Sequence, residues 1–333
     1  MIEYQDLINK IEIFQKEIVL KADNHLDYVM PSYTHLQRAQ PILLSHQLMA
    51  YYEMLQRDKL RLINCYEIAD ELILGSGAVA GSFYKLDRNF LAKELGFKKI
   101  NSNSIDGVSD RDFIIEFLSS ISISMMHLSR ISEELIIWCS EEFDFIKLSN
   151  DVVTTSSMMP QKRNPDFLEL IRGKFGGVLG NFISLLVTMK SLPFSYNRDM
   201  QEDKKPLLNS VDEFSNSLIN MTQIIKKSKF NKIKLENATN GNILATDIAD
   251  LLTLNGVPFR EAHIKVSDLT NKLNKQDKVL SDLSPTDLKE MLEVDFNLKI
   301  DLFKSINSRK LKGGTATAQV RKEIIAAKKS LKL

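Results

Sequence analysis

Hydrophobic side chains recur at steps of three and four residues through most of the first two thirds of the chain. Residues 2–28, 43–74, 166–189 and 207–225 share this spacing with residues 112–138. In residues 112–138 the spacing marks one face of a helix about seven turns long. This face is formed by Ile114, Phe117, Leu118, Ile121, Met125, Leu128, Ile131, Leu135 and Trp138. No segment shows the alternation typical of a strand. The pattern predicts an all-α fold built on a bundle of long helices.

The pattern changes after about residue 230, where Asn and Lys become frequent and the apolar segments shorten. We therefore predict two domains. Residues 1–235 form a central helical bundle that carries the polar loops described below, and residues 236–333 form a small C-terminal helical domain. The second domain ends with a turn at Gly313-Gly314 and a last helix that begins at Thr315 or Thr317.

Composition excludes several classes of protein. The 44 Lys and Arg residues balance 43 Asp and Glu residues, so the chain lacks the basic surface of a protein that binds nucleic acid or membrane. The longest uncharged stretch, residues 175–189, is shorter than the roughly 20 apolar residues of a membrane span. Cys65 and Cys139 lie in apolar helical patterns, which argues against a disulfide framework and favours a cytoplasmic location.

Three polar loops between the long helices hold candidate chemistry. Residues 31–41 contain His35, residues 155–166 are rich in Ser and Met and end in a Lys-Arg-Asn cluster, and residues 195–205 alternate charges with Tyr and Gln. Hydroxyls, backbone N–H groups and cations gathered at a helix start suit an anion. On composition alone, each loop also has a plainer interpretation as a surface histidine, a flexible linker or a solvated charge run.

These loops resemble the motifs of the argininosuccinate lyase family, within the fumarase/aspartase superfamily. Residues 156–165, Ser-Ser-Met-Met-Pro-Gln-Lys-Arg-Asn-Pro, are similar to the superfamily signature Ser-Ser-x-Met-Pro-x-Lys-x-Asn-Pro. Residues 33–41, Tyr-Thr-His-Leu-Gln-Arg-Ala-Gln-Pro, and 196–204, Tyr-Asn-Arg-Asp-Met-Gln-Glu-Asp-Lys, narrow the resemblance to argininosuccinate lyase. Further similar motifs follow in the family's order at residues 104–112, 257–263 and 313–316.

The resemblance implies an all-α lyase that cleaves argininosuccinate reversibly into arginine and fumarate, a reaction of arginine biosynthesis. The elimination begins with removal of a proton and requires no metal or other cofactor. Argininosuccinate is the small-molecule partner, and neither nucleic acid nor membrane is expected. The resemblance also implies a homotetramer in which each active site takes loops from three subunits.

Roles follow by position in the motifs. Ser156 matches the loop serine that removes the proton, and Lys162 and Asn164 match the residues that hold the developing carboxylate charge. His35 matches the family's proton donor, and Glu169 matches the carboxylate that pairs with it. The substrate-binding positions are matched by Thr34, Tyr196, Gln201 and Lys204.

The chain departs from the family pattern at two points. The first glycine of the signature is Thr155, which stiffens the loop because Thr lacks the backbone freedom of Gly. Family members also begin with an N-terminal segment on the order of 100 residues, and its His-Thr-Gly-Arg-Ser-Arg-Asn-Asp-like motif does not occur in this sequence. We therefore expect a separate N-terminal segment as a partner, with the chain alone nearly inactive until that segment is supplied in trans.

Two other interpretations stay open at the level of sequence. One is a truncated, catalytically impaired copy that keeps the bundle and serves as a structural or interaction protein. The other is a sister lyase that acts on adenylosuccinate or on a muconate derivative. The spacing of Tyr196, Gln201 and Lys204 argues against the sister lyase.

Overall fold

The computed structural model describes residues 2–296 and 301–333, which contain thirteen α-helices and only short strands. The predicted all-α fold is confirmed. The chain divides into two compact units. Unit 1 holds the chain up to Glu17 together with Tyr51–Ser140 and Leu148–Ser228, and unit 2 holds Ile18–Ala50, Glu141–Lys147 and Lys229–Leu333. The predicted domain boundary between residues 235 and 236 stays a prediction.

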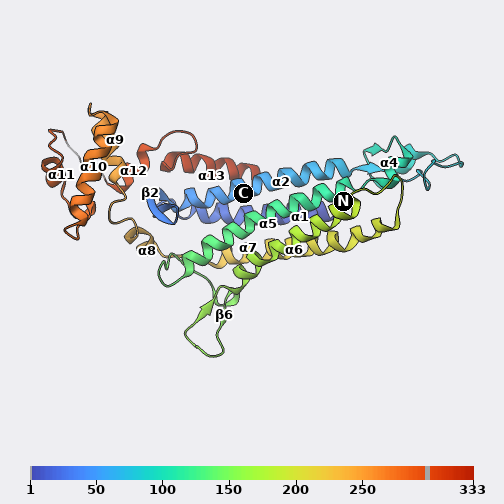
Figure 1. Cartoon of the computed structure of the whole chain (residues 1–333), viewed down its shortest axis with the longest axis horizontal. Coiled ribbons are helices and arrows are strands. Elements are labelled where there is room, and N and C mark those ends of the chain that lie inside the picture. The colour runs from blue at the N-terminus through green and yellow to red at the C-terminus, as the bar shows by residue number, and fades with distance from the viewer. Residues whose placement is uncertain (1, 297–300) are drawn as a thin grey trace. The chain divides into compact units, whose positions relative to one another are not determined.

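Three long helices run side by side in unit 1: α5 (Asp112–Cys139), α6 (Asp166–Met189) and α7 (Lys204–Lys227) (Figure 1). The start of α6 lies beside the end of α5, where Arg172 donates to Glu133. The end of α6 packs against the start of α5 through Leu185 and Ile114. The two helices are therefore antiparallel.

The face predicted for α5 is the face that the structure buries. All nine apolar residues named above, from Ile114 to Trp138, are buried. Burial of each large side chain contributes roughly 1.5–3 kcal/mol to stability. Two buried serines on the same helix bond to its own backbone: Ser122 donates to the carbonyl oxygen of Leu118 at 2.8 Å, and Ser124 donates to that of Ser120 at 3.0 Å.

The helices α1 (Ile2–Asp23) and α2 (Leu44–Ala69) extend through both units. Within unit 1, α2 brings Asp58 against α5. Each oxygen of the fully buried Asp58 carboxylate lies 2.9 Å from Nδ1 of His127. Nη1 of Arg61 donates to Oδ1 of the same carboxylate at 3.1 Å. Loss of Asp58 would leave the ring of His127, which is 8% exposed, buried without this carboxylate.

The remaining elements of unit 1 are short. The helices α3 (Arg88–Leu95) and α4 (Ser104–Ser109) accompany the parallel pair β3 (Glu71–Leu72) and β4 (Lys99–Ile100). Arg88 holds this region together, because its guanidinium donates to three backbone carbonyl oxygens at 3.0–3.1 Å, those of Leu72, Leu74 and Asn101. The 3-10 helices η1 (Asn150–Val152) and η2 (Arg198–Asp203) flank α6.

Unit 2 contains a hairpin that the sequence did not predict. The polar loop expected at residues 31–41 is instead β1 (Val29–Thr34) paired with β2 (Gln37–Leu43). The two-residue turn is His35-Leu36, and its φ values of 54° and 58° mark a type I′ turn. The usual signals of such a hairpin are absent, since the turn has neither Asn nor Gly and both strands contain Pro. The hairpin packs beside α8 (Lys232–Asn237) and α12 (Leu302–Ser308).

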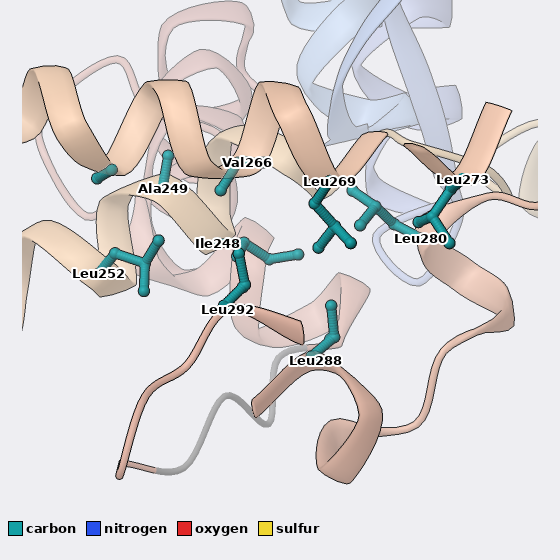
Figure 2. Close-up of a cluster of buried hydrophobic side chains, with 10 residues drawn as sticks. Ile248, Ala249, Leu252, Val266, Leu269, Leu273, Leu280, Leu288 and Leu292 are labelled. Carbon is teal, nitrogen blue, oxygen red and sulfur yellow. The ribbon is translucent and has the colours of Figure 1, made fainter. Parts of the chain in front are cut away.

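The C-terminal part of unit 2 has its own apolar core. Ten side chains, largely leucines of α9 (Ala245–Leu254), α10 (Phe259–Asn274) and α11 (Pro285–Met291), pack together there (Figure 2). The 3-10 helix η3 (Leu280–Asp282) adds Leu280 to this cluster. The last helix, α13 (Thr317–Leu331), begins at the second of the two predicted positions. Unit 2 also contains the antiparallel pair β5 (Ile146–Lys147) and β8 (Lys229–Phe230).

Replacement of Asp58 by Ala tests the buried contact between α2 and α5. We expect the free energy of unfolding to fall by about 3 kcal/mol, because His127 and Arg61 lose their buried carboxylate. Asp6→Ala is the matched control, since Asp6 is exposed and pairs with Lys10 one turn away; its effect should stay below about 1 kcal/mol. Urea unfolding measures both, and equal effects would contradict the structural role of Asp58.

Candidate active site

The segment that contains Ser156 is a small hairpin directly before α6. The strands β6 (Thr154–Thr155) and β7 (Arg163–Asn164) pair antiparallel. The loop between them is closed by the N–H of Ser156, which donates to the carbonyl oxygen of Lys162 at 3.3 Å. The hairpin, residues 154–164, is called the serine loop below. Lys162 and Asn164 therefore lie just before the positive end of the α6 dipole, where an anion is favoured.

The hydroxyl of Ser156 is held by backbone donors. Its Oγ accepts hydrogen bonds from the N–H groups of Met158 at 3.3 Å and Met159 at 3.1 Å, and the residue is half-buried. Donors to an oxygen favour its charged form, so both bonds stabilise the alkoxide relative to the hydroxyl. This arrangement suits a serine that must take a proton from carbon.

The base of the serine loop is tied to its surroundings. The hydroxyl of Thr154 donates to the carboxylate of Asp166 in the first turn of α6, and Arg163 donates to the side chain of Asn150. Thr155, which replaces the signature glycine, lies in β6 and is not among the described residues with positive φ. A side chain at this position therefore requires no left-handed backbone.

Glu169 lies on the first turn of α6 and is exposed. Its carboxylate interacts electrostatically with the thiol of Cys139 at the end of α5. Burial raises the pKa of the Cys139 thiol to about 11, and the nearby carboxylate of Glu169 adds to that shift. Glu169 is thereby placed at the end of the bundle that carries the serine loop.

The second group of candidate residues follows α6. The 3-10 helix η2 and the start of α7 place Gln201 and Lys204 three residues apart, so both project from the same side. Both are exposed, as is Tyr196 just before η2. The opposite side is buried through Met200 and Asp203. This segment, residues 196–204, is called the tyrosine segment below.

The buried carboxylate of Asp203 lies between two cations. Its Oδ2 accepts from Nε of Arg111 at 2.6 Å, and its Oδ1 accepts from Nζ of Lys204 at 3.0 Å. Arg111 directly precedes α5. Neither Arg111 nor Asp203 had a predicted role, although both lie in motifs similar to the family. The contact between them could not be predicted from sequence spacing, because 92 residues separate them.

Thr34 and His35 belong to unit 2, at the tip of the β1–β2 hairpin. His35 occupies the first position of the type I′ turn, and both side chains are exposed. The hydroxyl of Ser32 fastens the hairpin below them, because it donates to the carbonyl oxygen of Gln40 at 2.8 Å and accepts from the N–H of Gln40 at 3.1 Å. The pairing of His35 with Glu169 stays a prediction.

The structure separates the serine loop from the tyrosine segment within one chain. The first precedes α6 and the second follows it, and a helix of 24 residues is about 35 Å long. Each group is fixed at its end of the helix, the serine loop by Asp166 and the tyrosine segment by Arg111. A single substrate of ordinary size cannot contact both groups of one chain.

In the described residues, no group of three or more His, Cys, Asp or Glu side chains is placed to hold a metal ion. The predicted site residues themselves carry hydroxyl, ammonium, amide, imidazole and carboxylate groups. These groups suit proton transfer and the binding of carboxylates.

Two family models match the chain, "Lyase" over residues 2–180 and "Argininosuccinate lyase C-terminal" over residues 242–310. The argininosuccinate lyase of Sulfurihydrogenibium sp. is 48% identical over 96% of this chain and 70% of its own length. That of Carboxydothermus hydrogenoformans is 46% identical over 98% of this chain and 72% of its own length.

A solved structure of an EDDS lyase variant with bound fumarate is 26% identical to this chain. It superposes with a TM-score of 0.89 over 99% of this chain and 68% of that one. A 3-carboxy-cis,cis-muconate lactonizing enzyme from Pseudomonas putida, 17% identical with a TM-score of 0.77 over 99% of this chain and 73% of that one, shares the fold.

Alkylation of Cys139 tests where Glu169 lies. Because the pKa of this thiol is raised from 9.0 to about 11, its thiolate fraction near pH 8 is about a hundredfold below that of an ordinary thiol. We expect slow reaction with iodoacetamide, followed by mass spectrometry of the Cys139 peptide, and a rate that rises with pH up to about 11. Glu169→Gln should lower the pKa and speed the reaction, whereas the exposed Glu142→Gln should not. Equal rates in the two variants would show that Glu169 lies elsewhere.

Proposed function

Because the chain belongs to the argininosuccinate lyase family, we propose that the serine loop and the tyrosine segment are two parts of its active site, contributed by different subunits. The reaction is the reversible cleavage of argininosuccinate into arginine and fumarate. The separation of the two groups by the length of α6 is the observation that carries the proposal. A copy that runs antiparallel to the first can bring its tyrosine segment to the other's serine loop.

Ser156 removes the proton from the substrate carbon that neighbours a carboxylate. The electron pair of the broken C–H bond first spreads into that carboxylate and then forms the double bond of fumarate. As the double bond forms, the bond from the adjacent carbon to the guanidinium nitrogen breaks, and arginine leaves. The two N–H donors on Ser156 Oγ support this role, since they lower the cost of the alkoxide.

Lys162 and Asn164 hold the carboxylate on which charge develops. An ammonium group and an amide donor can bind its two oxygens more strongly as the second negative charge appears. The start of α6 adds the positive end of the helix dipole at the same place. Charge stabilisation of this kind lowers the barrier because it acts mainly in the transition state.

His35 supplies a proton to the departing nitrogen, directly or through water, and Glu169 pairs with the imidazole ring and orients it. The exposed position of His35 at the tip of a tight turn supports this role, because the ring is presented to a ligand while the hairpin backbone is fixed. Thr34, Tyr196, Gln201 and Lys204 bind the substrate.

The chain also assembles as a homotetramer in this proposal. Within the described residues, α6 is the one helix long and apolar enough by composition to cross a membrane, and only 17% of its most apolar window is buried in the chain. Gly173, Gly176, Gly177 and Gly180 lie along α6, and a Cβ added at any of them would meet no atom of this chain within 4 Å. An apolar face with small residues fits close contact with helices of other copies.

We predict different kinetic effects for the two parts of the site. Ser156→Ala removes the base but no binding contact, so kcat should fall at least about a hundredfold with little change in KM. Lys204→Ala removes a cation that holds a substrate carboxylate, so KM should rise with kcat less affected. The assay is release of fumarate from argininosuccinate, followed by ultraviolet absorbance, with the N-terminal segment supplied in trans to the parent protein and to every variant.

Similar kinetic changes in both variants would contradict this division of roles. If calorimetry detects no binding of argininosuccinate to the parent protein or to either variant, and no turnover is measured, the chain is better explained as a structural protein. Ser267→Ala is a control of comparable size, since Ser267 is exposed on α10 and lies in neither the serine loop nor the tyrosine segment.

We predict a mass of four chains in light scattering after size-exclusion chromatography. Ile183→Glu should give smaller species, because this exposed residue lies on the apolar part of α6 and a buried charge opposes association. Leu254→Glu, at an equally apolar but distant exposed position in α9, should leave the mass unchanged. A stable monomer of the parent protein at micromolar concentration would overturn the assembly.

A further inference from the structure

Arg111, Asp203 and Lys204 form a chain of contacts that ends at the tyrosine segment. Nε of Arg111 donates to Oδ2 of Asp203 at 2.6 Å, and Nζ of Lys204 donates to Oδ1 at 3.0 Å. The side chain of Asp203 is 5% exposed, that of Arg111 16%, and that of Lys204 70%. The carboxylate is thus fixed inside the protein, whereas the ammonium that it holds faces solvent.

Arg111 is itself fixed. Its Nη1 donates to the carbonyl oxygen of Asp110 at 2.6 Å, and the residue directly precedes the long helix α5. The side chain of Asp203 therefore has a rigid support on one oxygen and a flexible lysine on the other. A lysine side chain otherwise loses much rotamer entropy when it binds a ligand.

From this geometry we propose that Asp203 is a positioning residue, which Arg111 orients and which holds the Lys204 ammonium ready for a carboxylate of the substrate. The inference rests on the proposed role of Lys204 in substrate binding. Preorganisation reduces the entropy lost on binding, so the effect belongs to substrate affinity and not to the chemical step.

Arg111 has a second effect through charge. Two cations and one carboxylate leave the cluster with one net positive charge, which attracts an anionic substrate. Without Arg111, Asp203 and Lys204 would form a neutral pair, and the carboxylate would compete with the substrate for the ammonium. Arg111 thus balances part of the negative charge of Asp203, so that the Lys204 ammonium stays available to a carboxylate of the substrate.

Asp203→Asn separates positioning from simple attraction, because the two predict opposite results. The variant raises the net charge of the cluster by one unit, so attraction alone would lower KM. Loss of the charged anchor leaves the lysine free to move, so positioning predicts a higher KM. We expect KM to rise about tenfold, with kcat changed by less than about threefold.

The measurement compares kcat and KM of the parent protein, Asp203→Asn, Lys204→Ala and the double variant. Because Asp203 acts through Lys204, the double variant should have the KM of Lys204→Ala alone. Asp212→Asn is the matched control: it removes an exposed carboxylate from α7, the helix that begins at Lys204, and should leave KM within about twofold. Calorimetric titration of argininosuccinate into the same variants in the Ser156→Ala background gives the affinity without turnover.

An unchanged or lower KM in Asp203→Asn, or additive effects in the double variant, would overturn the inference. If Asp203→Asn fails to fold, Arg111→Gln and Arg111→Lys replace it. The first should raise KM and the second should restore most of the affinity, whereas equal KM values would again overturn the inference. Failure of the proposed function is distinct, since Lys204→Ala itself would then leave KM and affinity unchanged.

Discussion

The length of α6 is the constraint on which the candidate site depends. This helix places the serine loop at one end and the tyrosine segment at the other, and each is bonded to structure at its own end. An α-helix of this size cannot shorten or fold back without loss of its backbone hydrogen bonds. The proposed function therefore requires that helices from different copies lie antiparallel, and it links folding, assembly and formation of the site.

Much of the helical structure could be predicted because long helices bury a periodic face. The segment 166–189 matches α6 at both ends, and every apolar residue expected to be buried on α5 is buried. The β1–β2 hairpin could not be predicted in this way. Its strands contain Pro31 and Pro41, which face each other across the ladder, and local turn chemistry gives no signal at His35-Leu36.

The site was predictable only in part. Residue types and motif order predict roles for Ser156, Lys162 and Lys204, because these residues match positions in the motifs of the family, and these roles stay predictions. Periodicity and spacing could not show that Asp203 lies against Arg111, since that contact joins residues far apart in the chain.

The turn at the tip of the β1–β2 hairpin restricts which sequences can present the imidazole of His35. Both turn residues have left-handed backbone conformations, which cost roughly 1–2 kcal/mol for a residue with a side chain. Gly and Asn at position 36 relieve this strain, whereas the β-branched residues Val, Ile and Thr increase it. In a library that randomises position 36, selection for stability alone would enrich Gly and Asn and deplete the β-branched residues.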